Sequence, residues 1–216
     1  MSKYSLIVFD MDGTLADTSP GILNSHRYAH QAMGRAIPDE AVLRSVIGGP
    51  LLRTYQERFG FSESDARTAV AHYRNYYRRS GVFQAALYPK IPELLRGLLA
   101  HGMSLGVATL KAETFAVDML KRMGVYDCFS AVCGMDENDT RTKAELIRQC
   151  MKLTGTASNE TLLVGDSMHD WEGACTAGVG FIGVTYGFGF SAAEAYTDFL
   201  ICHSPKEILL KIENNL

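Results

Sequence analysis

The sequence predicts an α/β fold: a parallel sheet core with helices on both faces, and a small α-helical cap inserted after the first strand. Two observations carry this prediction. Short apolar runs alternate with amphipathic, helix-like stretches along most of the 216 residues, which is typical of a parallel sheet. Residues from about 18 to 81 interrupt the alternation, because they show helical periodicity and no clear strand.

The predicted strands are the apolar runs 6–9, 105–109, 130–133, 161–165, 181–184 and a shorter candidate at 199–201. An amphipathic helix is expected between the second and third of these runs. Its apolar positions are spaced three or four residues apart, at Phe115, Ala116, Met119, Leu120 and Met123.

The interruption predicts a helical cap. Ser19 can cap a helix that has Pro20 at its first position, and Gly34 can end it. One face of this helix would carry Ile22, His26, Ala29 and Met33.

The next helical stretch is broken by Gly48 to Pro50, and residues 63–81 predict a longer helix closed by Gly81. We expect residues 1–15 and 84–216 to form the α/β core and residues 16–83 the cap. An insert directly after the first strand would stand over that strand's carboxyl end.

Composition excludes several classes of function. The chain is 47% hydrophobic and 21% charged, which is ordinary for a globular protein. Its net charge of −3 provides no overall basic field, so we expect neither nucleic acid nor an anionic membrane as a partner.

With no run of about 18 apolar residues, we expect a cytoplasmic protein. Its five cysteines are scattered, which predicts buried free thiols rather than disulfides or a zinc site.

Ligands of open α/β sheets bind beyond the carboxyl ends of the strands, so the residues at those ends matter most. The first strand delivers Asp10 and Asp12. The second ends at Thr109, and a later strand ends at Asp166, with Asp170 four residues on. Four carboxylates and one hydroxyl would therefore share one rim of the sheet.

Four clustered acids repel one another unless a cation neutralises them. A site built only from oxygen ligands suits Mg²⁺. One acid can instead act as a nucleophile and another as a general acid or base. In the tight turn after Asp12, the backbone N–H groups of Gly13 and Thr14 are candidate donors to phosphate oxygens.

Lys143 supplies a positive charge. Thr142 and Glu145 form a capping-box pattern, which puts Lys143 in the first turn of a helix. A cation there opposes the helix dipole by roughly 0.3–1 kcal/mol, so its presence invites a functional explanation. Taken alone, Lys143 could equally point to solvent.

Single motifs have ordinary explanations. A lone D-x-D before glycine is usually a turn, and the segment ending at Asp166 can be a strand-to-helix turn capped by aspartate. The segment 178–183, "GVGFIG", matches the dinucleotide fingerprint but leads into a strand rather than following one. His169 is expected to be a surface or capping histidine, and the basic and aromatic segment 72–79 a solvated cap face.

The conjunction of the motifs is specific. "DMDGTLADT", Thr109, Lys143 and "GDSMHD", in this order, resemble the haloacid dehalogenase superfamily of phosphotransferases. The resemblance spans the chain and extends to the phosphoglycolate-phosphatase-like branch through "VIGGPLLRTY", "YPKIPELLRGL" and "GMDENDTRTKAELI". It implies a Rossmann-like core with a helical cap.

The resemblance also implies roles for the rim residues. Asp10 would attack phosphorus and become a transient aspartyl phosphate. Asp12 would protonate the leaving oxygen and then activate water. Thr109 and Lys143 would bind phosphate oxygens, and Lys143 would offset charge near Asp10. Because dehalogenase-type members lack an acid at the position of Asp12, its presence favours phosphate chemistry.

For the metal, the resemblance implies Mg²⁺ held by Asp10, the backbone carbonyl of Asp12, and Asp166. Asp170 would be a ligand or a residue that orients one. One departure concerns the second motif, where Leu110 replaces the usual polar residue. Lys111 is expected to compensate by binding substrate.

Substrate choice is expected in the cap. Gly48 and Gly49 would let a cap loop approach the rim closely. Arg53 could meet a substrate carboxylate or second phosphate bidentately, or it could be a surface arginine. His26 and Tyr55 are weaker candidates for substrate contact.

Three functions compete. The leading one is a Mg²⁺-dependent phosphatase, a monomer or homodimer, acting on a small phosphorylated metabolite such as phosphoglycolate or a nucleoside monophosphate. The alternatives are a sugar-phosphate mutase, which would return phosphate to the substrate, and a catalytically idle binding protein. The intact set of acids argues against the last.

Overall fold

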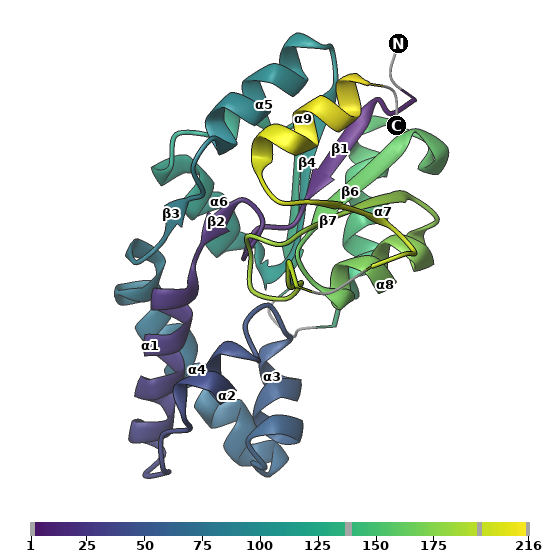
Figure 1. Cartoon of the computed structure of the whole chain (residues 1–216). Helices are drawn as coiled ribbons and strands as arrows, with labels where there is room; N and C mark the ends of the chain where they lie inside the picture. The colour runs from purple at the N-terminus through teal and green to yellow at the C-terminus, as the bar shows by residue number, and fades with distance from the viewer. Residues whose placement is uncertain (1–2, 137–139, 194–195, 215–216) are drawn as a thin grey trace.

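A parallel six-stranded sheet forms the centre of the computed structural model, which describes residues 3–136, 140–193 and 196–214 (Figure 1). The strands lie in the order β5-β4-β1-β6-β7-β8, and every neighbouring pair is parallel. Their bounds are β1 Leu6–Phe9, β4 Ser104–Ala112, β5 Ala131–Met135, β6 Thr161–Gly165, β7 Gly180–Val184 and β8 Leu200–Cys202. The predicted parallel sheet is confirmed.

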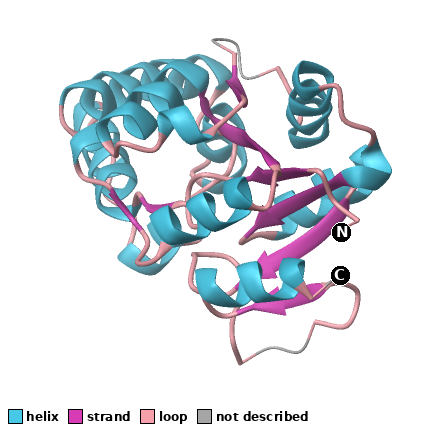
Figure 2. Ribbon diagram, turned by 90° about the horizontal axis from the view of Figure 1, so that it is seen from above, coloured by secondary structure: helices cyan, strands magenta, loops and turns pink. Residues whose placement is uncertain are grey.

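The alternation of side chains along β1 divides the core into two layers. Ile7 and Phe9 pack into one apolar cluster with residues of α5 (Ile91–Ala100), α6 (Glu113–Arg122) and α9 (Pro205–Glu213). Leu6 and Val8 pack into the other with residues of α7 (Lys143–Thr154) and α8 (Met168–Ala177). Both faces of the sheet are therefore covered by helices (Figure 2).

The remaining helices follow β1. They are α1 (Ser19–Ala32), α2 (Glu40–Arg44), α3 (Leu51–Arg53), a π-helical turn at Thr54–Arg58 and α4 (Glu63–Arg79). A two-stranded antiparallel ribbon, β2 (Ala16–Asp17) with β3 (Ala86–Leu87), flanks this stretch. Short 3₁₀ turns occur at Gly81–Phe83, Tyr126–Cys128 and Ser158–Glu160. Figure 1 shows α1 to α4 together, beyond the carboxyl end of β1. The core and cap boundaries at residues 15/16 and 83/84 stay a prediction.

Several local predictions need correction. Ser19 is not the cap but the first residue of α1, and Asp17 Oδ1 accepts hydrogen bonds from its N–H (3.0 Å) and its hydroxyl (2.7 Å). Helix α4 ends at Arg79, and Gly81 begins a 3₁₀ turn instead of closing the helix. Its role is close packing, because a Cβ on Gly81 would lie 2.7 Å from Tyr77 Cδ2 and 3.0 Å from Ser25 Oγ.

Strand β4 also continues past its predicted end at Thr109. An irregularity in its pairing with β5 lets Ala112 pair with Met135 after the regular register ends at Ala108. As a result, Thr109, Leu110 and Lys111 lie inside a strand at the sheet's rim.

All five cysteines are free, as predicted, although Cys175 is exposed and Cys128 only half-buried. Among the described residues, no helix is both long and apolar enough to cross a membrane. Within the motif "GMDENDTRTKAELI", Glu137 to Asp139 lie outside the described residues.

Candidate active site

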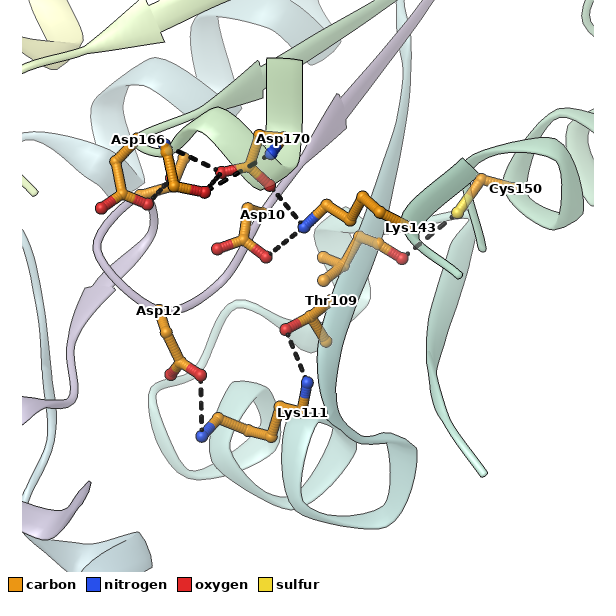
Figure 3. Close-up of polar contacts among 11 residues, drawn as sticks. Asp10, Asp12, Thr109, Lys111, Lys143, Cys150, Asp166 and Asp170 are labelled. Atoms are coloured by element: carbon orange, nitrogen blue, oxygen red, sulfur yellow. Dashed lines mark hydrogen bonds and ion pairs between the residues drawn. The ribbon is translucent and has the colours of Figure 1, made fainter. Parts of the chain in front are cut away.

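The carboxyl ends of β1 and β6 bring the predicted acids to one place (Figure 3). Asp10, Asp166 and Asp170 each offer a carboxylate oxygen, and these oxygens all lie within 4.8 Å of one another. All three side chains are buried. This is possible because β1 and β6 are hydrogen-bonded neighbours and α8, which carries Asp170, follows β6 directly.

Burial governs the charge of this cluster. It raises the pKa of Asp10 to about 7, an effect that Lys143 opposes and that Asp170 and Asp12 reinforce. Burial and the neighbouring carboxylates of Asp170 and Asp10 hold the pKa of Asp166 well above its usual range. The three acids together form a site that a cation would stabilise.

Lys143 does not point to solvent. The predicted capping box is present, with Thr142 Oγ1 accepting from the Glu145 N–H and the Glu145 carboxylate accepting from the Thr142 N–H. It fixes the start of α7 so that the Lys143 ammonium reaches Asp10 Oδ1 at 2.6 Å and Asp170 Oδ1 at 2.7 Å. Burial opposes the charge on Lys143, but the two carboxylates outweigh it and raise the pKa of the ammonium above its usual value.

Asp170 serves two contacts at once. Its Oδ2 accepts hydrogen bonds from the N–H (3.1 Å) and hydroxyl (2.7 Å) of Ser167, the cap of α8, while Oδ1 binds Lys143. Both oxygens are therefore engaged. Of the two roles expected for Asp170, this arrangement favours orienting its neighbours.

Asp166 is held by a segment that the sequence did not single out. The backbone N–H groups of Phe188 (2.7 Å) and Gly189 (3.2 Å) donate to Oδ2, and the Thr14 hydroxyl donates to Oδ1 at 3.3 Å. Gly187 packs so closely that a Cβ there would lie 2.3 Å from the Gly13 carbonyl oxygen. The glycines of "YGFGF" were the available signal of this close approach.

The backbone N–H groups of the turn after Asp12 donate hydrogen bonds to carbonyl oxygens within the same turn. The Gly13 N–H donates to the Ala16 carbonyl oxygen at 3.0 Å, and the Thr14 N–H donates to the Met11 carbonyl oxygen at 3.4 Å. These two groups are thus not open to phosphate, contrary to the prediction, because the turn closes on itself. Gly13 is required instead by its φ of 88° and by its contact with Asp166.

Lys111 also differs from its predicted role. Its ammonium contacts the Asp12 carboxylate, at 3.0 Å from Oδ2, and donates to the Tyr77 hydroxyl at 2.9 Å. Burial opposes the charge on Lys111, but Asp12 and Tyr77 outweigh it and raise the pKa of the ammonium. In this structure Lys111 is paired with protein groups rather than open to substrate. Thr109 Oγ1 accepts from the Lys111 N–H at 3.2 Å.

Two pockets adjoin over the acids, and both are lined by Asp10, Asp12, Gly48 and Gly49. The first is lined by polar and apolar side chains of α1, α4, β4 and α6, among them His26, Tyr73, Tyr77, Thr109, Lys111 and Phe115. The second reaches Lys143, Asp166, Asp170, His169 and Arg53.

Arg53 and Tyr55, both candidates for substrate contact, are placed differently. Arg53 borders the second pocket with a side chain that is 71% exposed and paired with Glu57 at 2.7 Å. Tyr55 lines neither pocket; it is buried, and its hydroxyl lies 3.1 Å from His26 Nδ1.

Tyr73 and Tyr77 correct a further prediction. The segment 72–79 is not wholly a solvated face, because these two tyrosines are buried and stack with ring centroids 5.9 Å apart. Their spacing of four residues was the signal that both lie on one face of the helix. In contrast, Gly178 ends α8 and Gly180 begins β7, so the dinucleotide match has no strand before it.

Comparison with known proteins identifies the family of this chain. Residues 7–184 match the model of the family described as haloacid dehalogenase-like hydrolase. A 5'-nucleotidase of Pseudomonas aeruginosa is 42% identical over 188 residues, which cover 87% of this chain and 85% of the relative. A phosphoglycolate phosphatase of Thiobacillus denitrificans is 30% identical over 190 residues, covering 84% and 83% of the two chains.

Among solved structures, a predicted phosphatase from Clostridium acetobutylicum superimposes with a TM-score of 0.91. The two chains are 32% identical, and the match covers 99% of this chain and 100% of the other. The similarity therefore includes the helices between β2 and β3 as well as the sheet.

Proposed function

This chain belongs to the haloacid dehalogenase-like hydrolase family and is a phosphatase of that family, and on this premise we propose that it hydrolyses a small-molecule phosphate monoester through an aspartyl phosphate on Asp10. Nucleoside monophosphates and phosphoglycolate-like esters are the proposed substrates. The names of the two relatives support this choice.

The position of Asp10 carries the proposal. It ends β1 at the rim of the sheet, buried between the Lys143 ammonium on one side and the carboxylate of Asp166 on the other, and it borders both pockets. A carboxylate held in one orientation by an ammonium group, inside a pocket, is suited to attack a bound phosphorus atom. Lys143 would also stabilise the charge that builds on the phosphoryl oxygens.

The site fits a divalent cation. Within the part of the chain that the structure describes, the ammonium groups of Lys111 and Lys143 are the cations paired with Asp10, Asp12 and Asp170. When these three acids and Asp166 are ionised, two negative charges remain. We propose that Asp10, Asp166 and the backbone carbonyl of Asp12 hold Mg²⁺, with Asp170 orienting them. Bound there, the ion would neutralise charge on the phosphate and on the acids.

The remaining roles follow from position. Asp12 lies two residues after Asp10 and borders both pockets, so it is placed to give a proton to the leaving oxygen and later to take one from water. Thr109 lines the first pocket and is proposed to bind a phosphate oxygen through its hydroxyl. Gly48, Gly49 and Arg53 would contact the rest of the substrate as the cap closes.

The test is phosphate release from a panel of small esters, with and without Mg²⁺. The panel contains nucleoside monophosphates, phosphoglycolate and sugar phosphates. Asp10→Asn preserves the size of the side chain but removes the nucleophile, and Asp118→Asn makes the same change at an exposed position of α6. We expect release that requires Mg²⁺, is lost in Asp10→Asn and is retained in Asp118→Asn.

Other outcomes would contradict the proposal. Release that persists in Asp10→Asn would exclude an aspartyl phosphate at this residue. Isomerised product with little free phosphate would indicate a mutase. No release from any ester by a folded protein that binds Mg²⁺ would remove hydrolysis of these substrates from consideration.

A further inference from the structure

Lys111 lies between the proposed acid of the core and a tyrosine of α4. Its side chain is only 6% exposed, and its ammonium contacts Asp12 Oδ2 at 3.0 Å and the Tyr77 hydroxyl at 2.9 Å. The contact between Lys111 and Asp12 is visible in Figure 3, well apart from the contact between Lys143 and Asp10. The two aspartates of the first motif are thus paired with different lysines.

The contact distinguishes the two oxygens of Asp12. Oδ2 accepts from Lys111, whereas Oδ1 is buried and has no hydrogen-bond partner within the described part of the chain. An ammonium group can only donate hydrogen bonds. Oδ2 is therefore engaged as an acceptor, which leaves Oδ1 as the oxygen available to carry and donate a proton.

Tyr77 fixes the other side of Lys111. Its hydroxyl donates to Met119 Sδ of α6 at 3.2 Å, which leaves its oxygen to accept from Lys111. The Lys111 ammonium also lies 4.5 Å from the centre of the Tyr77 ring. Since Tyr77 belongs to α4 and Met119 to α6, this contact joins the helices after β2 to the core beside Asp12.

We propose that Lys111 is a positioning residue that directs the proton-carrying oxygen of Asp12 toward the leaving group, and that Tyr77 holds Lys111 in place from the cap. This inference rests on the proposed function. It gives Lys111 a role other than the substrate contact that was expected. It also makes the orientation of the Asp12 carboxyl depend on the position of α4.

The proton movement balances in both steps. As the bond between phosphorus and the leaving oxygen breaks, the proton on Asp12 Oδ1 passes to that oxygen and the new bond forms between phosphorus and Asp10. In the second step, water oxygen bonds to phosphorus, the bond to Asp10 breaks, and one water proton passes to Asp12 Oδ1. Lys111 keeps its three protons throughout.

The experiment compares two esters of nearly the same shape, phenyl phosphate and 4-nitrophenyl phosphate. Phenolate is a much poorer leaving group than 4-nitrophenolate, so its departure needs the proton more. The variants are Lys111→Met, which keeps the length of the side chain, and Tyr77→Phe, which removes only the hydroxyl. The matched controls are Lys152→Met, at an exposed position of α7, and Tyr76→Phe, one residue away on α4.

We expect Lys111→Met to lose about tenfold more kcat/KM on phenyl phosphate than on 4-nitrophenyl phosphate, which is a part of the roughly 100-fold or more that a general acid contributes. Tyr77→Phe should shift the ratio in the same direction by a smaller factor. The controls should leave it unchanged. Because damage to the fold lowers both rates alike, the ratio separates positioning from stability, and Tyr77→Phe provides the test even where Lys111→Met folds poorly.

An unchanged ratio in both variants would overturn the inference. An equal rise in KM for both esters would instead return Lys111 to the predicted role in substrate binding. Failure of the proposed function is a separate result, because it would show in the wild-type protein, as absence of Asp10-dependent release from either ester.

Discussion

The Lys143 ammonium lies 2.6 Å from Asp10 Oδ1, although 133 positions separate the two residues in the chain. Both side chains are almost fully buried, at 6% and 9% exposed. A buried carboxylate is costly unless it is paired, so Lys143 opposes the rise in the pKa of Asp10 that burial causes and favours the ionised form of the carboxyl. Through Lys143, the position of α7 therefore affects the orientation and the charge of the proposed nucleophile, Asp10.

We predict that Lys143→Met lowers kcat by about 100-fold or more, because it removes the charge that orients Asp10 and stabilises the phosphoryl oxygens. Methionine is unbranched and similar in length, so it fills the same space. The measurement is phosphate release with the best ester of the panel. Lys152→Met, made on the same helix at an exposed position, should stay near the wild-type rate. A loss of less than threefold in Lys143→Met would contradict this role.

The rim of acids could be predicted from sequence because its information is local. Asp10 and Asp166 each end an apolar run, and parallel strands bring such ends to one edge. The capping box around Lys143 is likewise written in four consecutive residues. Signals of this kind predict which strand or helix a residue belongs to and where that element begins or ends. The structure confirms these predictions for β1, β6 and α7.

The partners of Lys111 and Asp166 could not be predicted in the same way. Lys111 meets Tyr77 only because α4 packs beside α6, and Asp166 meets Phe188 and Gly189 only because the segment after β7 folds back over the rim. Such contacts depend on how distant elements pack, which periodicity does not encode. The error at Gly13 has a local cause instead, because its N–H finds an acceptor inside its own turn.

Gly187 is predicted to be sensitive to a single methyl group. A Cβ there would lie 2.5 Å from Asp166 Oδ2 and 2.3 Å from the Gly13 carbonyl oxygen, so Gly187→Ala must displace Asp166 or the turn. We expect the Mg²⁺ concentration for half-maximal activity to rise about tenfold, as when an orienting partner of a metal ligand is lost.

The matched control is Gly97→Ala. Its Cβ would also be crowded, at 2.8 Å from Leu209 Cδ2, but it meets the end of a flexible side chain where α5 packs against α9. Its Mg²⁺ requirement should equal that of the wild type. Equal requirements in all three proteins would show that the segment 186–189 does not position Asp166.

Arg53 is predicted to select substrates with a second anionic group. It lines the larger pocket and is held by Glu57, one helical turn away. We expect Arg53→Ala to raise KM for phosphoglycolate, which carries a carboxylate, by about tenfold more than KM for phenyl phosphate. Arg67 forms the same kind of exposed pair with Glu63, so Arg67→Ala is the control and should change neither KM. Equal changes in KM for both substrates would contradict a role of Arg53 in selecting the substrate.

His26 is predicted to make the stability of the protein depend on pH. It is buried among the rings of Tyr55, Phe59 and Tyr73. Burial, with a smaller contribution from His30, lowers the pKa of His26 to about 3. In the unfolded chain the pKa of a histidine is about 6.5. Below that pH the unfolded state therefore binds a proton that the folded state refuses.

The free energy of unfolding must then fall as the pH drops from about 6.5 toward 3. For His26 alone we expect a loss of about 1.4 kcal/mol between pH 8 and pH 5.5. Urea unfolding of the wild type and of His26→Asn at both pH values measures this loss. The slope of the free energy of unfolding against pH is compared between the two proteins, and the difference isolates His26. His101→Asn, at an exposed position, should retain the wild-type slope. A slope in His26→Asn as steep as in the wild type would mean that His26 can be protonated without unfolding the helices that bury it.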